Sequence, residues 1–135
     1  MTEDAAELMQ ATMGELNDRL GVVFLEATPE RVVATMPVEG NRQPYGLLHG
    51  GASVALGETL GSTLAALNSP ADRSAVGIEI SATHHRSALS GIVTGVARPL
   101  NVGRTLVTSE IVVTDDQDRR VCTIRLTCLL RETRG

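Results

Sequence analysis

The spacing of hydrophobic residues predicts a helix at the start of the chain, followed by two short strands. Apolar side chains recur every three or four positions over residues 3–20, and Gly21 then interrupts the pattern. This is typical of an amphipathic helix and its end. Apolar and polar residues next alternate over 22–28 and 31–38. A period of two indicates half-buried β-strands.

A long apolar helix is expected in the middle of the chain, over residues 49–67. A loop rich in Gly, Asn and Pro precedes it over 39–48, and Asn68, Ser69 and Pro70 close it. Because nearly all positions of this helix are apolar, we expect it to be buried on most sides.

The remaining sequence alternates in the manner of antiparallel strands. In the first of them the alternation puts Ile78, Ile80 and His84 on one apolar face. Residues 99–103 are expected to form a loop, and the polar residues 115–118 a hairpin turn between the last two strands. The expected strands cover residues 76–83, 91–99, 104–114 and 119–131.

Together these elements predict an α+β fold in which an antiparallel sheet curls around the central helix. One helix cannot bury itself alone, and the strands offer enough apolar faces to cover it. The helix contains Gly50, Gly51, Gly57 and Gly61. Each glycine costs up to about 1 kcal/mol relative to alanine, which is tolerable where backbone must approach a sheet closely. No linker or repeat is present, so we expect one domain over 1–135 with an N-terminal helix in 1–20.

Composition and charge narrow the class of protein. Hydrophobic residues make up 42% of the chain, and no apolar run approaches the roughly 20 residues that a bilayer-spanning helix needs. The net charge is −4, and Phe24 and Tyr45 are the only aromatic residues, which argues against a nucleic-acid partner. The acidic N-terminus has no signal-peptide pattern. We expect a cytoplasmic protein that binds neither a membrane nor nucleic acid.

The two cysteines are expected to be buried, reduced thiols. Cys122 and Cys128 lie six residues apart in a predicted strand, so both point to the same apolar side. The chain has no CxxC motif and no Cys/His cluster with zinc spacing. We therefore expect neither a metal nor another cofactor.

Glu58 stands out in the central helix because it is the only acid between Glu39 and Asp72. A carboxylate among apolar residues is costly unless it is paired, solvated or employed in chemistry. Ser62, four residues later, shares its helix face. Glu58 can serve as a general base for water or as a nucleophile that forms a mixed anhydride. The alternative is a half-buried glutamate that only bonds a polar neighbour.

The start of the same helix is suited to binding an oxyanion. Backbone N–H groups there lack helical partners and carry partial positive charge, and Gly50 has no side chain to keep an ester or thioester oxygen away. The Gly50–Gly51 pair can equally serve only a tight turn. His49 and Gln43 precede it, and each can either assist at the carbonyl or simply order the loop.

The spacing of these two residues predicts at least a dimer if they act together. Gly50 and Glu58 are eight residues apart, which is about 12 Å along a helix axis. Both therefore cannot touch one reacting carbon within a single chain. Antiparallel copies of the helix, related by a two-fold axis, bring Gly50 of one subunit near Glu58 of the other.

Three segments of the chain resemble the motifs of hotdog-fold acyl-CoA thioesterases. They are QPYGLLHGGASVALGETLGS, VGIEISATHHRSA and ARPLNVGRTLVTSEI, and together they cover most of residues 40–130. The chain is most similar to the phenylacetic-acid-degradation-type branch, which includes hydroxybenzoyl-CoA, dihydroxynaphthoyl-CoA and enterobactin-proofreading thioesterases. The resemblance implies a hotdog fold and hydrolysis of an acyl-CoA thioester with an aryl or other short, bulky acyl group.

The resemblance also implies roles for matching residues. Glu58 matches the catalytic carboxylate, and Gly50 matches the residue whose N–H polarises the thioester carbonyl. His49, Gln43 and Ser62 match polar residues near the thioester. The positions implied to bind CoA are Gly77, His84, His85, Arg86, Ser87, Asn101, Val102, Gly103, Arg104, Thr105 and Leu106. The family further implies a homodimer with shared active sites, which in many members assembles further into a homotetramer as a dimer of dimers.

Two other functions are compatible with a hotdog fold. A dehydratase or hydratase of hydroxyacyl or enoyl thioesters would need an acid–base pair in a different pattern. A non-catalytic acyl-CoA-binding protein would bind the ester without turnover, and it would have no reason to keep a costly acid at position 58. Hydrolysis is therefore the favoured function.

Overall fold

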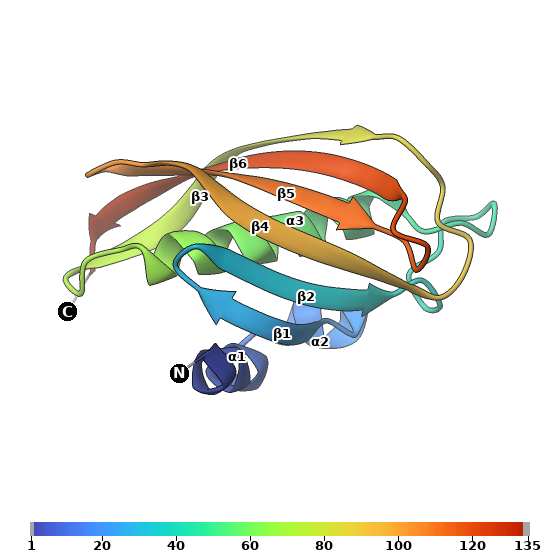
Figure 1. Ribbon diagram of the computed structural model, residues 1–135, viewed down its shortest axis with the longest axis horizontal. Coiled ribbons are helices and arrows are strands. Elements are labelled where there is room, and N and C mark those ends of the chain that lie inside the picture. The colour runs from blue at the N-terminus through green and yellow to red at the C-terminus, as the bar shows by residue number, and fades with distance from the viewer. Residues whose placement is uncertain (1, 134–135) are drawn as a thin grey trace.

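The protein is a sheet of six antiparallel strands that curves around one long helix (Figure 1). The computed structural model describes residues 2–133, so residue 1 and residues 134–135 of the predicted domain lie outside the described residues. The helices are α1 (Thr2–Ala11), α2 (Glu15–Leu20) and α3 (Gly50–Leu67). The strands are β1 (Val23–Thr28), β2 (Arg31–Pro37), β3 (Arg73–His84), β4 (Ile92–Val102), β5 (Leu106–Thr114) and β6 (Arg120–Glu132). The predicted α+β architecture is confirmed.

The order of strands in the sheet is β1-β2-β4-β5-β6-β3, so β1 and β3 form its two edges. All neighbouring pairs are antiparallel. The predicted hairpin turn joins β5 to β6, where the Asp115 carboxylate accepts hydrogen bonds from the backbone N–H groups of Gln117 and Arg119, both at 2.9 Å. This carboxylate holds the turn closed.

The core lies between α3 and the concave face of the sheet. Leu56, Leu60 and Leu64 are fully buried on one side of the helix. Ile111, Ile124 and Leu126 face them from β5 and β6 and are buried as well. Although α3 is the longest helix, neither it nor any other helix within residues 2–133 has the length and apolarity needed to cross a membrane.

Glycines let α3 lie directly on the sheet. A Cβ atom on Gly61 would stand 2.6 Å from Cδ2 of Leu126 and 2.8 Å from Oγ of Ser109. Gly57 faces Ile124 in the same way, one turn earlier. Because side chains at these positions would push the two layers apart, the sequence accepts the lower helix propensity of glycine.

The predicted single helix over residues 3–20 is wrong, because the chain breaks between α1 and α2. Gly14 has a φ of +85°, a left-handed value that no helical residue adopts. The break turns α2 away from α1. Gln10 ties α1 to the start of β1, since its side-chain amide donates to the Val22 carbonyl at 3.0 Å and accepts from the Phe24 N–H at 2.7 Å.

The predicted loop over residues 99–103 is also largely wrong, because β4 continues to Val102. Pro99 pairs with Ser109 of β5 inside the strand. The pairing of β4 with β2 on its other side ends at Ala97. Beyond that point β4 is an edge, and a proline without an N–H group costs no ladder hydrogen bond there.

The predicted alternation in β3 is right from Ile80 onward and wrong before it. A bulge between Gly77 and Glu79 shifts the register against β6. Gly77 is opposite Cys128 and therefore faces α3, while Ile78 is 57% exposed. A bulge places an extra residue in one strand and reverses the facing of all residues on one side of it.

Substitution of Gly61 by alanine tests the close contact between α3 and β6. Helix propensity alone would raise the free energy of unfolding by up to about 1 kcal/mol. We expect it to fall instead by about 1–3 kcal/mol, because the new methyl group overpacks the contact with Leu126. Urea denaturation measures the change.

Ala66→Gly is the matched control, since Ala66 is exposed on the same helix. It should cost about 1 kcal/mol from propensity alone. A Gly61→Ala variant more stable than the parent protein would contradict the close packing described above.

Candidate active site

The face of α3 that the sheet leaves uncovered carries the polar residues of the helix. Glu58 and Thr59 lie there, followed one turn later by Ser62 and Thr63. Glu58 is exposed in the single chain, and within residues 5–133 it forms no ion pair. The alternative of a half-buried glutamate that only bonds a polar neighbour is thus not met within one chain, where Glu58 is exposed.

Gly77 lies against the Glu58 carboxylate. A Cβ atom on Gly77 would be 2.7 Å from Oε2 of Glu58. The bulge in β3 turns Gly77 toward the helix, and the missing side chain leaves room for the carboxylate. Gly77, predicted as part of a CoA site, therefore lies next to the predicted catalytic acid.

Cys128 lies next to Gly77, on the inner face of β6. Its side chain is 1% exposed, and it is opposite Gly77 in the sheet. Burial raises the pKa of the Cys128 thiol; the neighbouring Ser62 hydroxyl opposes this rise, and the Glu58 charge adds to it. Burial likewise raises the pKa of the Cys122 thiol. Both cysteines are free and buried, as predicted.

A pocket of about 280 Å³ opens beside Glu58. Its floor is the polar face of α3, and its outer wall comes from the N-terminal helices and β1. The lining residues are Met9, Thr12, Met13, Asn17, Phe24, Glu58, Thr59, Ser62 and Thr63. A small molecule in this pocket would meet apolar groups on one side and hydroxyls, an amide and a carboxylate on the other.

The first turn of α3 leaves one backbone donor free. His49 is the N-cap residue, and its Nδ1 accepts a hydrogen bond of 2.8 Å from the Gly51 N–H. The Gly50 N–H has no acceptor within residues 5–133. The His84 ring covers this end of the helix, because a Cβ atom on Gly50 would be 3.1 Å from its Nε2.

A second pocket, of about 330 Å³, surrounds this helix start. Gln43 enters it from a tight loop, in which its side-chain oxygen accepts a hydrogen bond from the Tyr45 N–H. His85 lies at the rim and bonds the Thr123 hydroxyl at 2.8 Å. The pocket also includes Gly50, Ser53, His84, Arg86 and Ser87.

The predicted site residues therefore fall into two groups within one chain. Gln43 and Gly50 line the pocket at the helix start, whereas Glu58 and Ser62 line the pocket farther along α3. Among the residues that the structure describes, none lines both pockets. Their separation agrees with the spacing of about 12 Å expected along the helix.

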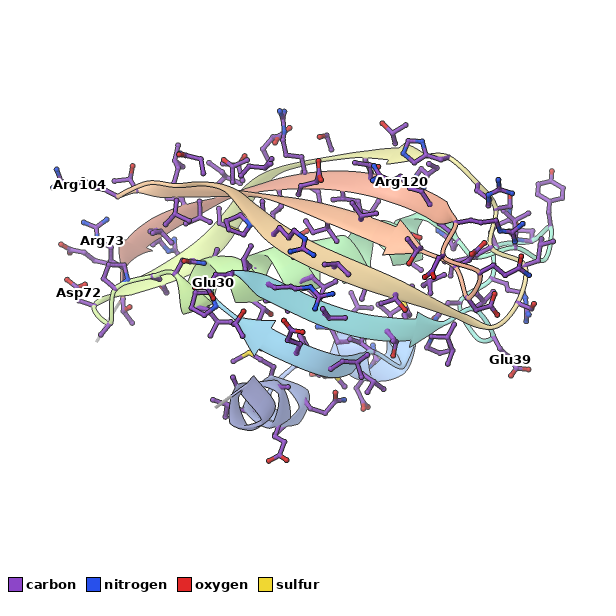
Figure 2. The ribbon with its side chains drawn as sticks, viewed as in Figure 1. Glu30, Glu39, Asp72, Arg73, Arg104 and Arg120 are labelled. Atoms are coloured by element: carbon purple, nitrogen blue, oxygen red, sulfur yellow. The ribbon has the colours of Figure 1, made fainter. Side chains whose placement is uncertain are left out.

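The third predicted group, residues 101–106, lies at the other end of the sheet. Thr105 accepts a hydrogen bond from the Leu130 N–H at 2.7 Å, while the Arg86 N–H donates to the Val121 carbonyl at 3.3 Å. The nine residue steps from Val121 to Leu130 span about 30 Å of strand. Figure 2 shows the same separation, with Arg104 beside Arg73 at one end and Arg120 toward the other. Arg86 and Arg104 of one chain thus cannot hold one pyrophosphate.

Several lining residues were not predicted from the sequence. Thr59 and Thr63 could have been found, because they adjoin Glu58 and Ser62 on the helix. Met9, Met13 and Asn17 could not, since nothing in the local pattern says where the N-terminal helices pack. Among the residues that the structure describes, no group of three or more His, Cys, Asp or Glu is placed to hold a metal ion.

Comparison with known sequences identifies relatives over most of the chain. The family model for the Thioesterase superfamily matches residues 45–122. The proofreading thioesterase EntH of Cronobacter sakazakii is 48% identical over 122 residues, which cover 89% of each chain.

Comparison with solved structures gives the same family. Thioesterase HI1161 from Haemophilus influenzae superimposes with a TM-score of 0.87 at 34% identity, over 98% of this chain and 91% of that chain. A variant of thioesterase PA1618 from Pseudomonas aeruginosa superimposes with a TM-score of 0.88 at 36% identity, over 98% and 95%. These similarities extend through the N-terminal helices as well as the sheet.

The buried thiols provide a test of this part of the structure. We expect Cys122 and Cys128 of the native protein to resist a colorimetric thiol reagent at about pH 8, and both to react in denaturant. Because burial raises their pKa, the folded state keeps protons that the unfolded chain releases above about pH 8.5. The stabilisation from this difference should be fully present below that pH, and the free energy of unfolding should fall as the pH rises above it. Labelling of the native protein as fast as of a free thiol would contradict the burial.

Proposed function

The chain belongs to the thioesterase superfamily, and from that membership we propose that it hydrolyses acyl-CoA thioesters of small aryl acids at a site shared by two subunits. Its fold is the hotdog fold, and it is a thioester hydrolase. The proposal concerns the substrate, the residues and the assembly. The observation that carries it is the position of Glu58, which faces a pocket on the open side of α3.

In the proposed reaction the Gly50 N–H binds the thioester carbonyl oxygen. This N–H has no acceptor within residues 5–133, and it lies at the positive end of α3. As the carbonyl carbon is attacked, its oxygen becomes anionic, and a fixed N–H donor stabilises that charge. His49 stabilises this helix start, because its Nδ1 accepts a hydrogen bond from the neighbouring Gly51 N–H.

Glu58 supplies the second half of the chemistry. As a general base it takes a proton from water, which then attacks the carbonyl. As a nucleophile it forms a mixed anhydride that water hydrolyses afterwards. In both routes the CoA thiolate leaves and the free acid is released. Ser62 lies one turn away on the same face, where its hydroxyl can hold the water or orient the carboxylate.

A dimer through β3 would unite the two halves. β3 is an edge strand whose free side is exposed along most of its length, and such an edge readily pairs with another strand. Gly50 of α3 lies at the His84 end of β3. Antiparallel pairing of two β3 strands would therefore also set the two α3 helices antiparallel, as the spacing of Gly50 and Glu58 requires.

The same pairing suits the nucleotide end of CoA. Arg86 follows the end of β3, whereas Arg104 lies beside Arg73 at its start. In an antiparallel pair of β3 strands, the end of one strand meets the start of the other. The proposed pyrophosphate site therefore combines Arg86 of one subunit with Arg104 of the partner subunit, and arginine forms forked bonds to such oxygens.

The pocket beside Glu58 fits a small acyl group. Its volume of about 280 Å³ is at the lower end of the roughly 300–1,000 Å³ usual for small-molecule sites. Met9, Met13 and Phe24 offer apolar contacts to a ring, and the hydroxyls of α3 offer hydrogen bonds to polar ring substituents. This supports an aryl acid, the acyl class that the resemblance to the phenylacetic-acid-degradation-type branch implies.

Glu58→Gln tests the assignment of the catalytic acid. The substitution keeps the size of the side chain and removes its charge, so we expect release of free thiol from benzoyl-CoA to fall by roughly 10²- to 10⁴-fold. Glu30→Gln, at the exposed turn between β1 and β2 (Figure 2), is the control and should keep the parental rate. Parental turnover by folded Glu58→Gln protein would exclude Glu58.

Mixed dimers test whether the site is shared. Gln43→Ala and Glu58→Gln affect residues that line different pockets. In a dimer with one copy of each, a shared arrangement leaves one intact site and one doubly altered site. We expect purified mixed dimers, carrying two different tags, to regain about half the parental rate. Mixed dimers as inactive as the two single variants would indicate that each site lies within one chain.

A further inference from the structure

The N-terminal helices form a separate wall over the open face of α3. α1 ends at Ala11, and α2 begins at Glu15, so residues 12–14 make a joint. Met13 of this joint lines the pocket beside Glu58, and Met9 lines it from the last turns of α1. The depth of the pocket is therefore set by how closely the joint approaches α3.

One side chain ties the joint to α3. The Thr59 hydroxyl donates a hydrogen bond of 2.7 Å to Oδ1 of Asn17, and Nδ2 of Asn17 donates one of 2.7 Å to the Met13 carbonyl. Asn17 thus bridges the joint and the residue that follows Glu58. Both bonds are partly buried, where a hydrogen bond is less exposed to competition from water.

Packing holds this region in part, because Met9, Met13 and Leu20 are partly buried against the core. α2 contains no buried residue, so little apolar burial fixes its position over α3. α1 is fixed to β1, because Gln10 makes hydrogen bonds to the residue just before β1 and to the strand itself. Within residues 5–133, the side-chain hydrogen bonds that link the joint to α3 are the pair made by Asn17, which we call the Asn17–Thr59 latch.

We propose that the Asn17–Thr59 latch sets the length of acyl group that the enzyme accepts, with Asn17 as a specificity-determining positioning residue. The inference rests on the proposed function, in which the acyl group occupies the pocket beside Glu58. With the latch closed, Met13 limits the depth of that pocket. With the latch broken, the joint is free to move away from α3, and a longer chain can enter.

The expected change in selectivity follows from how strongly a hydrophobic pocket discriminates between acyl groups of different length. One methylene group too many or too few in a hydrophobic pocket changes kcat/KM by roughly 10- to 200-fold. A joint displaced by the length of one or two methylenes should therefore change the ratio of rates for long and short acyl groups by about tenfold or more. A general loss of stability would lower both rates together and leave their ratio unchanged.

The experiment compares kcat/KM for decanoyl-CoA and benzoyl-CoA in Asn17→Ala, in Thr59→Val and in the double variant. We expect each single variant to raise the ratio of decanoyl to benzoyl by about tenfold. The double variant should raise it no further, because both changes break the same bond. Thr59→Ser, which retains the hydroxyl, should restore the parental ratio.

Arg19→Ala is the matched control on α2. Arg19 is exposed, and within residues 5–133 its one ion pair is that of 3.6 Å with Glu15 on the same helix, so its loss should leave the ratio unchanged. An unchanged ratio in both latch variants would overturn the inference. Failure of both to fold would also overturn it, because the latch would then support the fold rather than the pocket.

Glu58→Gln, assayed in parallel, separates this inference from the proposed function. If Glu58→Gln is inactive and the ratio in the latch variants is unchanged, the latch has no role in selectivity although the site is correctly assigned. If Glu58→Gln remains active, the pocket beside Glu58 is not the acyl site, and both proposals fail together.

Discussion

The contact between the backbone of α3 and the inner face of the sheet is the constraint on which the rest of the structure depends. At Gly57 and Gly61 no side chain separates the helix from Ile124 and Leu126. With almost no large aromatic residues to fill a wider gap, the aliphatic core closes only if the two layers approach this closely. The strands then curve around the helix and bury one of its faces (Figure 1).

The closing of one face determines what the other face can do. Apolar and glycine residues occupy the sheet side of α3, so the polar residues gather on the open side, where Glu58 is exposed to a pocket. The first turn of α3 precedes these polar residues, and there the Gly50 N–H has no acceptor within residues 5–133. A single straight helix thus carries two chemical functions at two separate places, and their union requires a second chain in the proposed site.

Most of the fold could be predicted from the sequence, because long periodic segments fix the type of each element. The failures occur where local backbone conformation overrides the pattern. Gly14, with its left-handed φ, breaks a helix that periodicity alone would continue. The bulge beside Gly77 reverses the facing of part of β3. Pro99 lies within a strand because that part of β4 has only one neighbour.

The candidate site was predictable only in part, for a similar reason. Residues close in sequence, such as Glu58 and Ser62, are brought together by helical periodicity. The neighbours supplied by other elements depend on packing that no local pattern contains. Asn17 illustrates this, since forty-two positions separate it from Thr59. The motif around Gly77 predicts a CoA contact, and it does not predict that the bulge directs Gly77 toward the carboxylate of Glu58.

The glycine contact also fixes the angle at which α3 is rotated about its own axis. Each residue of a helix turns the direction of its side chain by about 100°. A slip of one position would point the Glu58 carboxylate at the aliphatic wall that Gly57 now faces, and would present a leucine to the pocket. The contact between the backbone of α3 and the sheet therefore determines the direction in which Glu58 points, since within residues 5–133 no ion pair holds its side chain.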